Sequence, residues 1–93
     1  MLVVMEILIY TKPGCHLCEQ AYDDLKVSLN EVPVRCDIQE RNILEKENWY
    51  QEYKLEIPVI VFNQGTVLKG KFGRDAIEDA LKRCLESHEE EAP

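Results

Sequence analysis

Residues 5–18, MEILIYTKPGCHLC, join an apolar run to a pair of cysteines through a Pro-Gly break. The run at residues 5–10 is apolar at nearly every position, which is typical of a strand buried on both faces. Pro13 and Gly14 then interrupt the strand, and helical spacing begins at Cys15. Two cysteines three positions apart at such a junction fit a zinc clip, a structural disulfide or a dithiol that cycles.

The elements that follow are predicted from hydrophobic periodicity. A first helix begins at Cys15 and ends at Asn30 and Pro33, because its apolar positions recur at three- and four-residue intervals. These positions are Cys18, Ala21, Tyr22, Leu25 and Leu29. The next segment alternates, with Val32, Val34, Cys36 and Ile38 on one face, which predicts an edge strand.

The second half of the chain predicts a helix, two strands and a last helix. Residues 42–53 predict a weaker helix that carries three large apolar side chains, Leu44, Trp49 and Tyr53. Residues 57–62, IPVIVF, predict a second central strand, and turn residues at 63–65 predict a hairpin with a short strand at 66–69. A last helix is predicted from the spacing of Ile77, Ala80, Leu81, Cys84 and Leu85.

The predicted order is therefore β-α-β-α-β-β-α, an α/β domain with a four-stranded mixed sheet and three helices. Strands joined by a helix should be parallel, and the closing hairpin adds an antiparallel half, with helices on both faces. Residues 1–88 are expected to form one domain, and residues 89–93 a flexible acidic tail.

Composition narrows the classes of function. The net charge of −7 argues against a nucleic-acid partner, and the apolar N-terminus contains Glu6 and is too short to span a bilayer. Either Met1 or Met5 fits as the start of the chain. Four cysteines are too few for a disulfide-stapled secreted scaffold, so we expect a cytoplasmic protein, or a protein of an organelle stroma if a transit segment is missing. We also expect the protein to act as a monomer.

The Cys-x-x-Cys pair at the start of a helix and the apolar-Pro pair before the third strand resemble the thioredoxin fold. The short N-terminus is similar to the glutaredoxin size class. The segments YTKPGCHLCEQA and IPVIVFNQG resemble the small glutaredoxin-like proteins of bacteria and plastids, over roughly residues 5–86.

The position of the two cysteines predicts different roles for them. Cys15 lies at the N-terminus of the predicted helix, where free N–H groups, the helix dipole and nearby Lys12 favour a thiolate. Cys18 lies one turn further on the apolar face, where it should be buried. The prediction is a thiol-disulfide oxidoreductase in which Cys15 attacks and Cys18 resolves the mixed disulfide.

Neighbouring residues are candidates for tuning or substrate binding. A cationic His16 would stabilise the Cys15 thiolate, and Leu17 would form an apolar rim for the substrate. The resemblance implies that Pro58 is cis and faces the dithiol, so that the backbone of Ile57 can receive a substrate strand.

The resemblance also implies glutathione as a reductant, with no cofactor bound, and either protein or glutathione disulfides as substrates. Lys12 would reach a glutathione carboxylate, and Gly70 and Asp75 partly match the turn that contacts glutathione in glutaredoxins. The sequence has CHLC, EIP and GKFGRD where glutathione-dependent glutaredoxins have other motifs, and Asp75 also suits a helix cap.

Two other functions remain open. One is a metal or iron-sulfur module, although one Cys-x-x-Cys and two histidines are a poor ligand set, so we assign no metal ligands. Cys36 and Cys84 lie on predicted core faces and are expected to be buried and inert. The other is a non-catalytic thioredoxin-fold adaptor, against which the retention of both cysteines and Pro58 argues.

Overall fold

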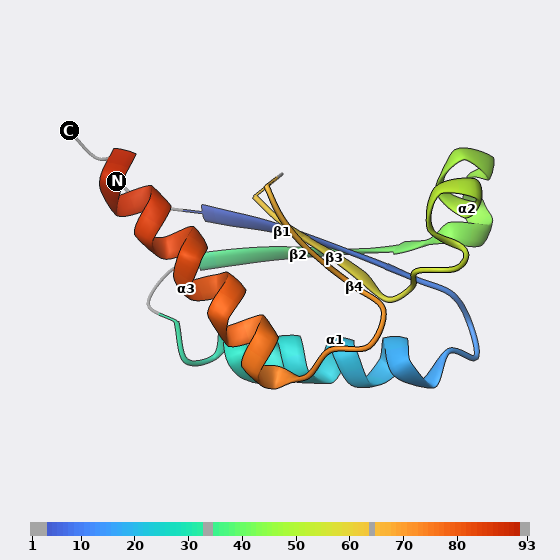
Figure 1. Cartoon of the computed structure of the whole chain (residues 1–93), viewed down its shortest axis with the longest axis horizontal. Coiled ribbons are helices and arrows are strands. Elements are labelled where there is room, and N and C mark those ends of the chain that lie inside the picture. The colour runs from blue at the N-terminus through green and yellow to red at the C-terminus, as the bar shows by residue number, and fades with distance from the viewer. Residues whose placement is uncertain (1–3, 33–34, 64, 92–93) are drawn as a thin grey trace.

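The computed structural model describes residues 4–32, 35–63 and 65–91. Its elements follow the predicted order along the chain (Figure 1). They are β1 (Val4–Thr11), α1 (His16–Leu29), β2 (Arg35–Asn42), the short 3-10 helix η1 (Ile43–Glu45), α2 (Glu47–Tyr53), β3 (Val59–Phe62), β4 (Thr66–Lys69) and α3 (Arg74–Glu91).

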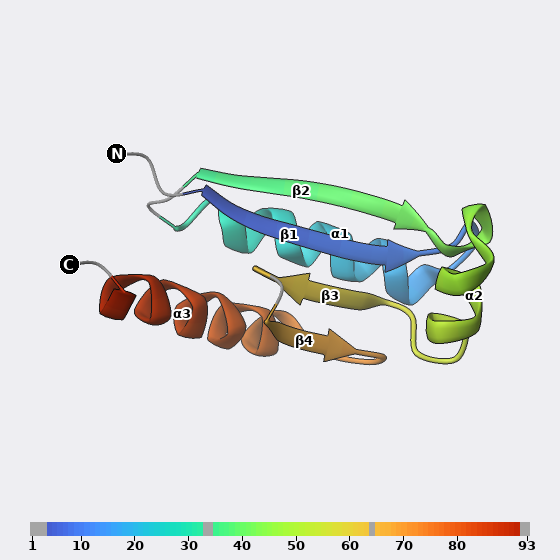
Figure 2. The same ribbon diagram turned by 90° about the horizontal axis from the view of Figure 1, so that it is seen from above.

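The four strands form one mixed sheet in the order β2-β1-β3-β4 (Figure 2). β1 pairs with β2 in parallel, and β3 is antiparallel to both β1 and β4. The two continuous apolar runs are thus the central strands, and the alternating segment is an edge strand, as predicted. The pairing of Thr11 with Asn42 brings the chain after β1 and the chain after β2 to the same end of the sheet.

The main core lies between one face of the sheet and the two longer helices, α1 and α3. In Figure 1, α1 lies below the sheet, and α3 crosses obliquely from beneath the sheet towards its left-hand end. Alternate residues of β1 point to this face, and Met5, Ile7 and Ile9 are fully buried there. Leu25 from α1 and Ile77 from α3 are also fully buried. Burying a side chain of this size stabilises the fold by about 1.5–3 kcal/mol.

Among the residues that the structure describes, those of α2 cover one end of the opposite face of the sheet (Figure 1). Tyr10, Ile43 and Val59 are buried there, and the three aromatic residues of α2 pack against them. These are Trp49, Tyr50 and Tyr53, which pack α2 onto the sheet.

The predicted helix at 42–53 is wrong in its first half. Asn42 belongs to β2, because the parallel pairing with β1 continues to Thr11. Its side-chain oxygen accepts a hydrogen bond at 2.9 Å from the backbone N–H of Leu44 and so begins η1 instead of an α-helix. Lys46 is extended, and α2 starts after it.

Two further boundaries differ from the prediction. β3 begins at Val59 rather than at Ile57, since Pro58 has no N–H with which to pair in a sheet. α3 continues to Glu91, so residues 89–91 are helical where a flexible tail was expected. Strong helix formers such as Glu and Leu, with neither Gly nor Pro among residues 74–91, explain the extension. Val34 and residues 92–93 lie outside the described residues.

Candidate redox site

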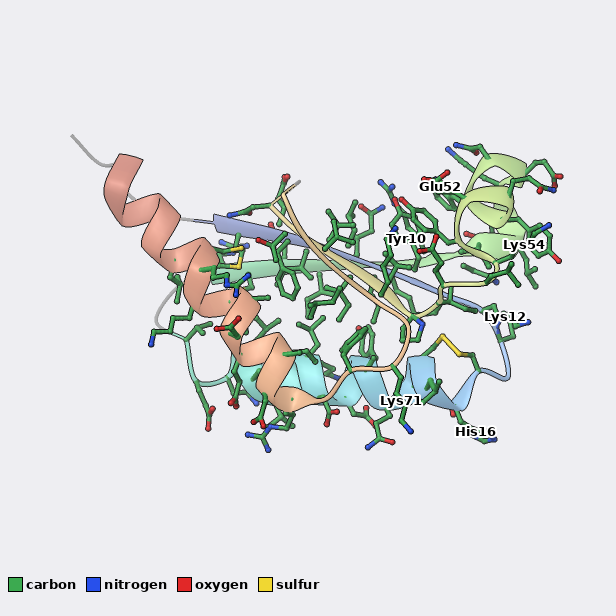
Figure 3. All side chains as sticks on the ribbon, viewed as in Figure 1. Tyr10, Lys12, His16, Glu52, Lys54 and Lys71 are labelled. Carbon is green, nitrogen blue, oxygen red and sulfur yellow. A yellow bond between two sulfur atoms is a disulfide. The ribbon has the colours of Figure 1, made fainter. Side chains whose placement is uncertain are left out.

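Cys15 and Cys18 are joined by a disulfide across the first turn of α1, with their Cα atoms 5.2 Å apart (Figure 3). Cys18 is buried, with 2% of its surface exposed, whereas Cys15 is half-buried. The sulfur that precedes the helix is therefore the more accessible one. This difference matches the roles predicted for the two residues.

The Cys15 sulfur acts as the N-cap of α1. Cys15 has extended backbone angles, and its Sγ accepts a hydrogen bond at 3.2 Å from the backbone N–H of Cys18. Gly14, with φ of +79°, makes the turn between the strand and this cap. A helix N-terminus offers unpaired N–H donors and a positive dipole, so a thiolate released on reduction of Cys15 would be stabilised there.

Three residues beside the disulfide are exposed. Lys12 lies at the rim of the site, and Leu17 is 48% exposed, as expected of an apolar rim. His16 has 98% of its side chain exposed, and its Nδ1 lies 3.4 Å from Oε2 of Glu19. Its imidazole points away from the disulfide in Figure 3. The tuning role of His16 stays a prediction. An exposed imidazole that points away from the disulfide and lies next to Glu19 would stabilise a Cys15 thiolate only weakly.

The peptide bond between Ile57 and Pro58 is cis, which confirms the predicted cis geometry. That Pro58 faces the dithiol stays a prediction. The loop that contains it is held by backbone hydrogen bonds on both sides. The N–H of Ile57 donates to the carbonyl of Tyr53 at 3.1 Å, and the N–H of Gly70 donates to the carbonyls of Pro58 (2.9 Å) and Glu56 (2.8 Å). Because the N–H of Ile57 is already bonded, only its carbonyl remains for a substrate strand.

The two residues proposed for glutathione contact lie on either side of the turn between β4 and α3. Gly70 follows β4 with φ of +72°, a backbone conformation that favours glycine. Asp75 is in the first turn of α3, where its carboxylate suits the helix dipole. A role for Asp75 at the helix start is therefore sufficient to explain its position, and the glutathione contact stays a prediction.

A cavity of about 370 Å³ opens beside the loop that leads to Cys15, and the sequence did not reveal it. Its lining includes Lys12 and three carboxylates, those of Glu19, Glu40 and Glu45. The buried hydroxyl of Thr11 donates to Oε2 of Glu40 at 2.9 Å. The predicted parallel pairing of β1 and β2 was the one sequence signal for this cavity, since it brings the carboxyl ends of both strands to the same edge of the sheet.

A second unpredicted cluster lies under α2. Arg41 donates a hydrogen bond from Nη1 to the hydroxyl of Tyr10 at 2.9 Å, and its guanidinium lies 4.9 Å from the ring centre of Trp49. Tyr10 also packs on the ring of Tyr53, at 4.3 Å between ring centres. Burial, and then the neighbouring Tyr10, raise the pKa of Tyr53. This cluster fixes α2 on the sheet.

The two other cysteines lie away from the disulfide. Cys84 is buried, as predicted, and its Sγ is 4.0 Å from the hydroxyl of Thr66. Cys36 is only half-buried, and burial, followed by the charge of Asp37, raises its pKa. Within residues 4–32, 35–63 and 65–91, no three His, Cys, Asp or Glu side chains are grouped so that they could hold a metal ion. No helix in this part of the chain is long and apolar enough to cross a membrane.

The family model of the glutaredoxin-like domain (DUF836) matches residues 6–82, which include both cysteines of the disulfide and Pro58. The chain belongs to this family. Such a domain with a bonded Cys15–Cys18 pair supports a function of redox type.

This glutaredoxin-like chain is also similar to two curated proteins with related names. It is 28% identical over 96 residues to a glutaredoxin-like protein of Dictyostelium discoideum (YDR286C homolog), covering 94% of this chain and 88% of that protein. It is 27% identical over 82 residues to a thioredoxin of Methanocaldococcus jannaschii, covering 87% of this chain and 96% of that protein.

Solved structures show the same fold. Protein XcR50 from X. campestris superposes with a TM-score of 0.70 at 22% identity, covering 83% of this chain and 96% of that one. Protein Ne2328 from Nitrosomonas europaea superposes with a TM-score of 0.65 at 23% identity, covering 87% and 94%. The predicted thioredoxin-like fold is thereby confirmed.

Proposed function

We propose that this protein is a thiol-disulfide oxidoreductase in which Cys15 attacks and Cys18 resolves. The observation that carries the proposal is the pairing of a half-buried sulfur at the N-cap of α1 with a buried sulfur one turn later. The position of Cys15 at a helix N-terminus favours the thiolate, and its exposed surface can contact another molecule. Cys18 is bonded to Cys15 and is buried from solvent.

The proposed reaction begins with the reduced protein. The Cys15 thiolate attacks one sulfur of a substrate disulfide, forming a mixed disulfide and releasing the other substrate sulfur as a thiolate. Cys18 then loses its proton and attacks the Cys15 sulfur, which forms the intramolecular disulfide and releases the second substrate thiolate. Two electrons pass from the protein dithiol to the substrate.

The substrates that we propose are protein or glutathione disulfides, with glutathione as a possible source of electrons. Lys12 is the candidate contact for a glutathione carboxylate, and the Ile57 carbonyl is the candidate acceptor for a substrate strand. We further propose that the protein works as a monomer in the cytoplasm or in an organelle stroma, because a small acidic domain with few cysteines suits a reducing compartment.

The test is disulfide reduction by single cysteine variants. Cys15→Ser should abolish reduction of a small disulfide, because the attacking sulfur is lost. Cys18→Ser should still attack once and then remain as a mixed disulfide, detectable by mass as one substrate thiol added per chain. Cys36→Ser is the matched control and should retain wild-type activity. Wild-type activity in Cys15→Ser would refute the proposal.

The electron donor is tested separately. The protein and an excess of a substrate disulfide are mixed with NADPH and either glutathione with glutathione reductase or thioredoxin reductase, and the oxidation of NADPH is followed. Turnover with glutathione would support the proposed reductant, and turnover only with thioredoxin reductase would replace it.

A further inference from the structure

The cavity beside the loop of residues 12–14 carries more negative than positive charge. This loop leads directly into Cys15 and contributes the ammonium of Lys12 to the lining. Three carboxylates line the cavity as well, those of Glu19, Glu40 and Glu45. One positive and three negative charges give the lining a net charge of −2, next to a cysteine whose sulfur is negative when it ionises.

One of the three carboxylates, that of Glu40, is held by a buried donor. Thr11 is buried, and its hydroxyl donates to Oε2 of Glu40 at 2.9 Å. This hydrogen bond joins the carboxyl end of β1 to the carboxyl end of β2, and Figure 2 shows both at the end of the sheet where α1 begins. The bond therefore keeps the charge of Glu40 at the end of the molecule that carries Cys15.

The other charges of the cavity are held less firmly. The side chain of Glu19 is 70% exposed, and its Oε2 lies 3.4 Å from Nδ1 of His16. Glu45 belongs to η1 and is exposed. Among the residues that the structure describes, Lys12 forms no ion pair with any of the three carboxylates. Glu40 is thus the charged residue of the cavity whose position is fixed by a bond between two strands.

A fixed negative charge near Cys15 acts on only one redox state of the protein. Both sulfurs are neutral in the disulfide, whereas Cys15 ionises in the dithiol. The carboxylate of Glu40 repels that thiolate, so it favours the disulfide and opposes the stabilisation by the helix N-terminus. At about 10 Å, roughly the width of the cavity, and an effective dielectric constant between those of water and of a protein surface, one charge changes an ionisation equilibrium about two- to five-fold.

We propose that the carboxylate of Glu40, positioned by Thr11, makes the Cys15–Cys18 dithiol a stronger reductant by destabilising the Cys15 thiolate. Thr11 is the positioning residue, because its hydroxyl holds the carboxylate at this end of the sheet. The inference rests on the proposed function and adds a direction to it. With Glu40 in place, the dithiol gives its two electrons to a disulfide more readily than the helix N-terminus alone would allow.

The experiment measures the redox equilibrium of the full-length protein with glutathione. One molecule of reduced protein and one of glutathione disulfide give one molecule of oxidised protein and two of glutathione, so two electrons leave the protein and one disulfide bond replaces another. The fraction of oxidised protein is read from alkylation and mass at a series of glutathione ratios. The wild type is compared with Glu40→Gln, which removes the charge and keeps an oxygen that can accept the Thr11 hydroxyl.

We expect Glu40→Gln to lower the equilibrium constant for oxidation of the protein about three-fold at pH 8 and 10 mM ionic strength, which corresponds to about 14 mV. Two pH units below the alkylation midpoint of Cys15 the difference should disappear, because the sulfur is then a neutral thiol. In 0.5 M salt the difference should shrink, because the charges are screened. In a Cys18→Ser background, Glu40→Gln should lower the midpoint of Cys15 alkylation by about 0.5 in pH.

Two variants of Thr11 test its positioning role. Thr11→Val removes the hydroxyl and keeps the charge of Glu40, which is then free to turn toward solvent. Its equilibrium constant should lie between those of the wild type and Glu40→Gln. Thr11→Ser keeps the donor and should behave as the wild type. A merely structural role for this hydrogen bond would change the free energy of unfolding and leave the alkylation midpoint of Cys15 in place.

The matched control is Asp37→Asn, which removes an exposed carboxylate from the same strand. Asp37 precedes Glu40 by three residues in β2, so it lies on the opposite face of the sheet and about 10 Å further from the carboxyl end of the strand. Asp37→Asn changes the net charge of the chain as Glu40→Gln does. It should leave both the equilibrium constant and the alkylation midpoint unchanged.

An unchanged equilibrium constant in Glu40→Gln, or an equal change in Asp37→Asn, would overturn the inference. The wild type separates this outcome from failure of the proposed function. If its Cys15–Cys18 pair exchanges reversibly with glutathione and Glu40→Gln has the same constant, only the role of Glu40 is refuted. If the wild-type pair exchanges with neither glutathione nor dithiothreitol, the proposed function is refuted as well.

Discussion

The backbone N–H of Cys18 donates a hydrogen bond to Sγ of Cys15 at 3.2 Å, so the first sulfur occupies the position that a Ser or Asp oxygen takes at many helix starts. An N-cap that can become an anion gains from both the N–H donors and the helix dipole. The same geometry that begins α1 thus prepares Cys15 for thiolate chemistry.

The first prediction concerns the ionisation of Cys15 in the reduced protein. Its pKa should lie below the ordinary value of about 8.5, because the helix N-terminus stabilises the thiolate. The rate of alkylation is measured against pH in Cys18→Ser, which keeps the backbone donor. His16→Ala should change the midpoint little, since the imidazole is exposed and faces Glu19. A midpoint at or above that of the unfolded chain would contradict the prediction.

The second prediction concerns the cluster under α2. Tyr10→Phe removes the acceptor of the Arg41 hydrogen bond and should cost about 1 kcal/mol of unfolding free energy. Arg41→Ala also removes the contact with Trp49 and should cost about 1–2 kcal/mol. Urea unfolding measures both, and the emission of Trp49, the single tryptophan, reports the change locally.

Lys82→Ala is the control for this cluster. It removes an exposed cation without a partner and should change stability by no more than about 0.5 kcal/mol. If Arg41→Ala were equally harmless, the contacts of Arg41 would contribute nothing to the stability of the fold.

The third prediction concerns stability at alkaline pH. Burial, and then Asp37, raise the pKa of Cys36, so the folded thiol keeps its proton at pH values where the unfolded thiol has lost it. The contribution is fully present below about pH 8.5 and is lost as pH rises through the folded pKa. Cys36→Ala should therefore lose less stability than the wild type between pH 8 and pH 10.

Urea unfolding of the oxidised protein at both pH values measures this difference, because the bonded Cys15 and Cys18 do not titrate. Equal pH dependence of the two proteins would show that the folded and unfolded pKa values of Cys36 coincide.

The fourth prediction compares two glycines in the turn before α3. Gly70 has φ of +72°, so Gly70→Ala should cost about 1–2 kcal/mol although there is open space around a new Cβ. Gly73 has the same open space without the positive φ, and Gly73→Ala should be nearly neutral. Thermal unfolding of both variants tests the prediction. Equal losses would mean that the backbone angle of Gly70 is not the cause.

Much of the fold could be predicted from local signals. The two continuous apolar runs became the central strands β1 and β3, and the alternating segment became the edge strand β2. The extent of α2 was mispredicted, because Asn42 suits both a helical pattern and the end of a strand. Only its pairing with Thr11 decides between them.

The site could also be predicted only where local signals are sufficient. Cys15 and Cys18 are neighbours in sequence, so helical spacing alone indicated which sulfur would be exposed and which buried. The hydrogen bonds from Thr11 to Glu40 and from Arg41 to Tyr10 join residues about thirty positions apart, and no periodic pattern reveals them.

The sequence by itself determined the strand-to-helix junction, the order of the elements and the different burial of the two sulfurs, because these follow from turn residues and hydrophobic periodicity. The tertiary structure decided what surrounds the sulfurs. It bonds Gly70 to Pro58, and it collects three carboxylates beside Lys12. Such neighbours depend on strand register and loop packing, which bring distant parts of the chain together only when the whole domain folds.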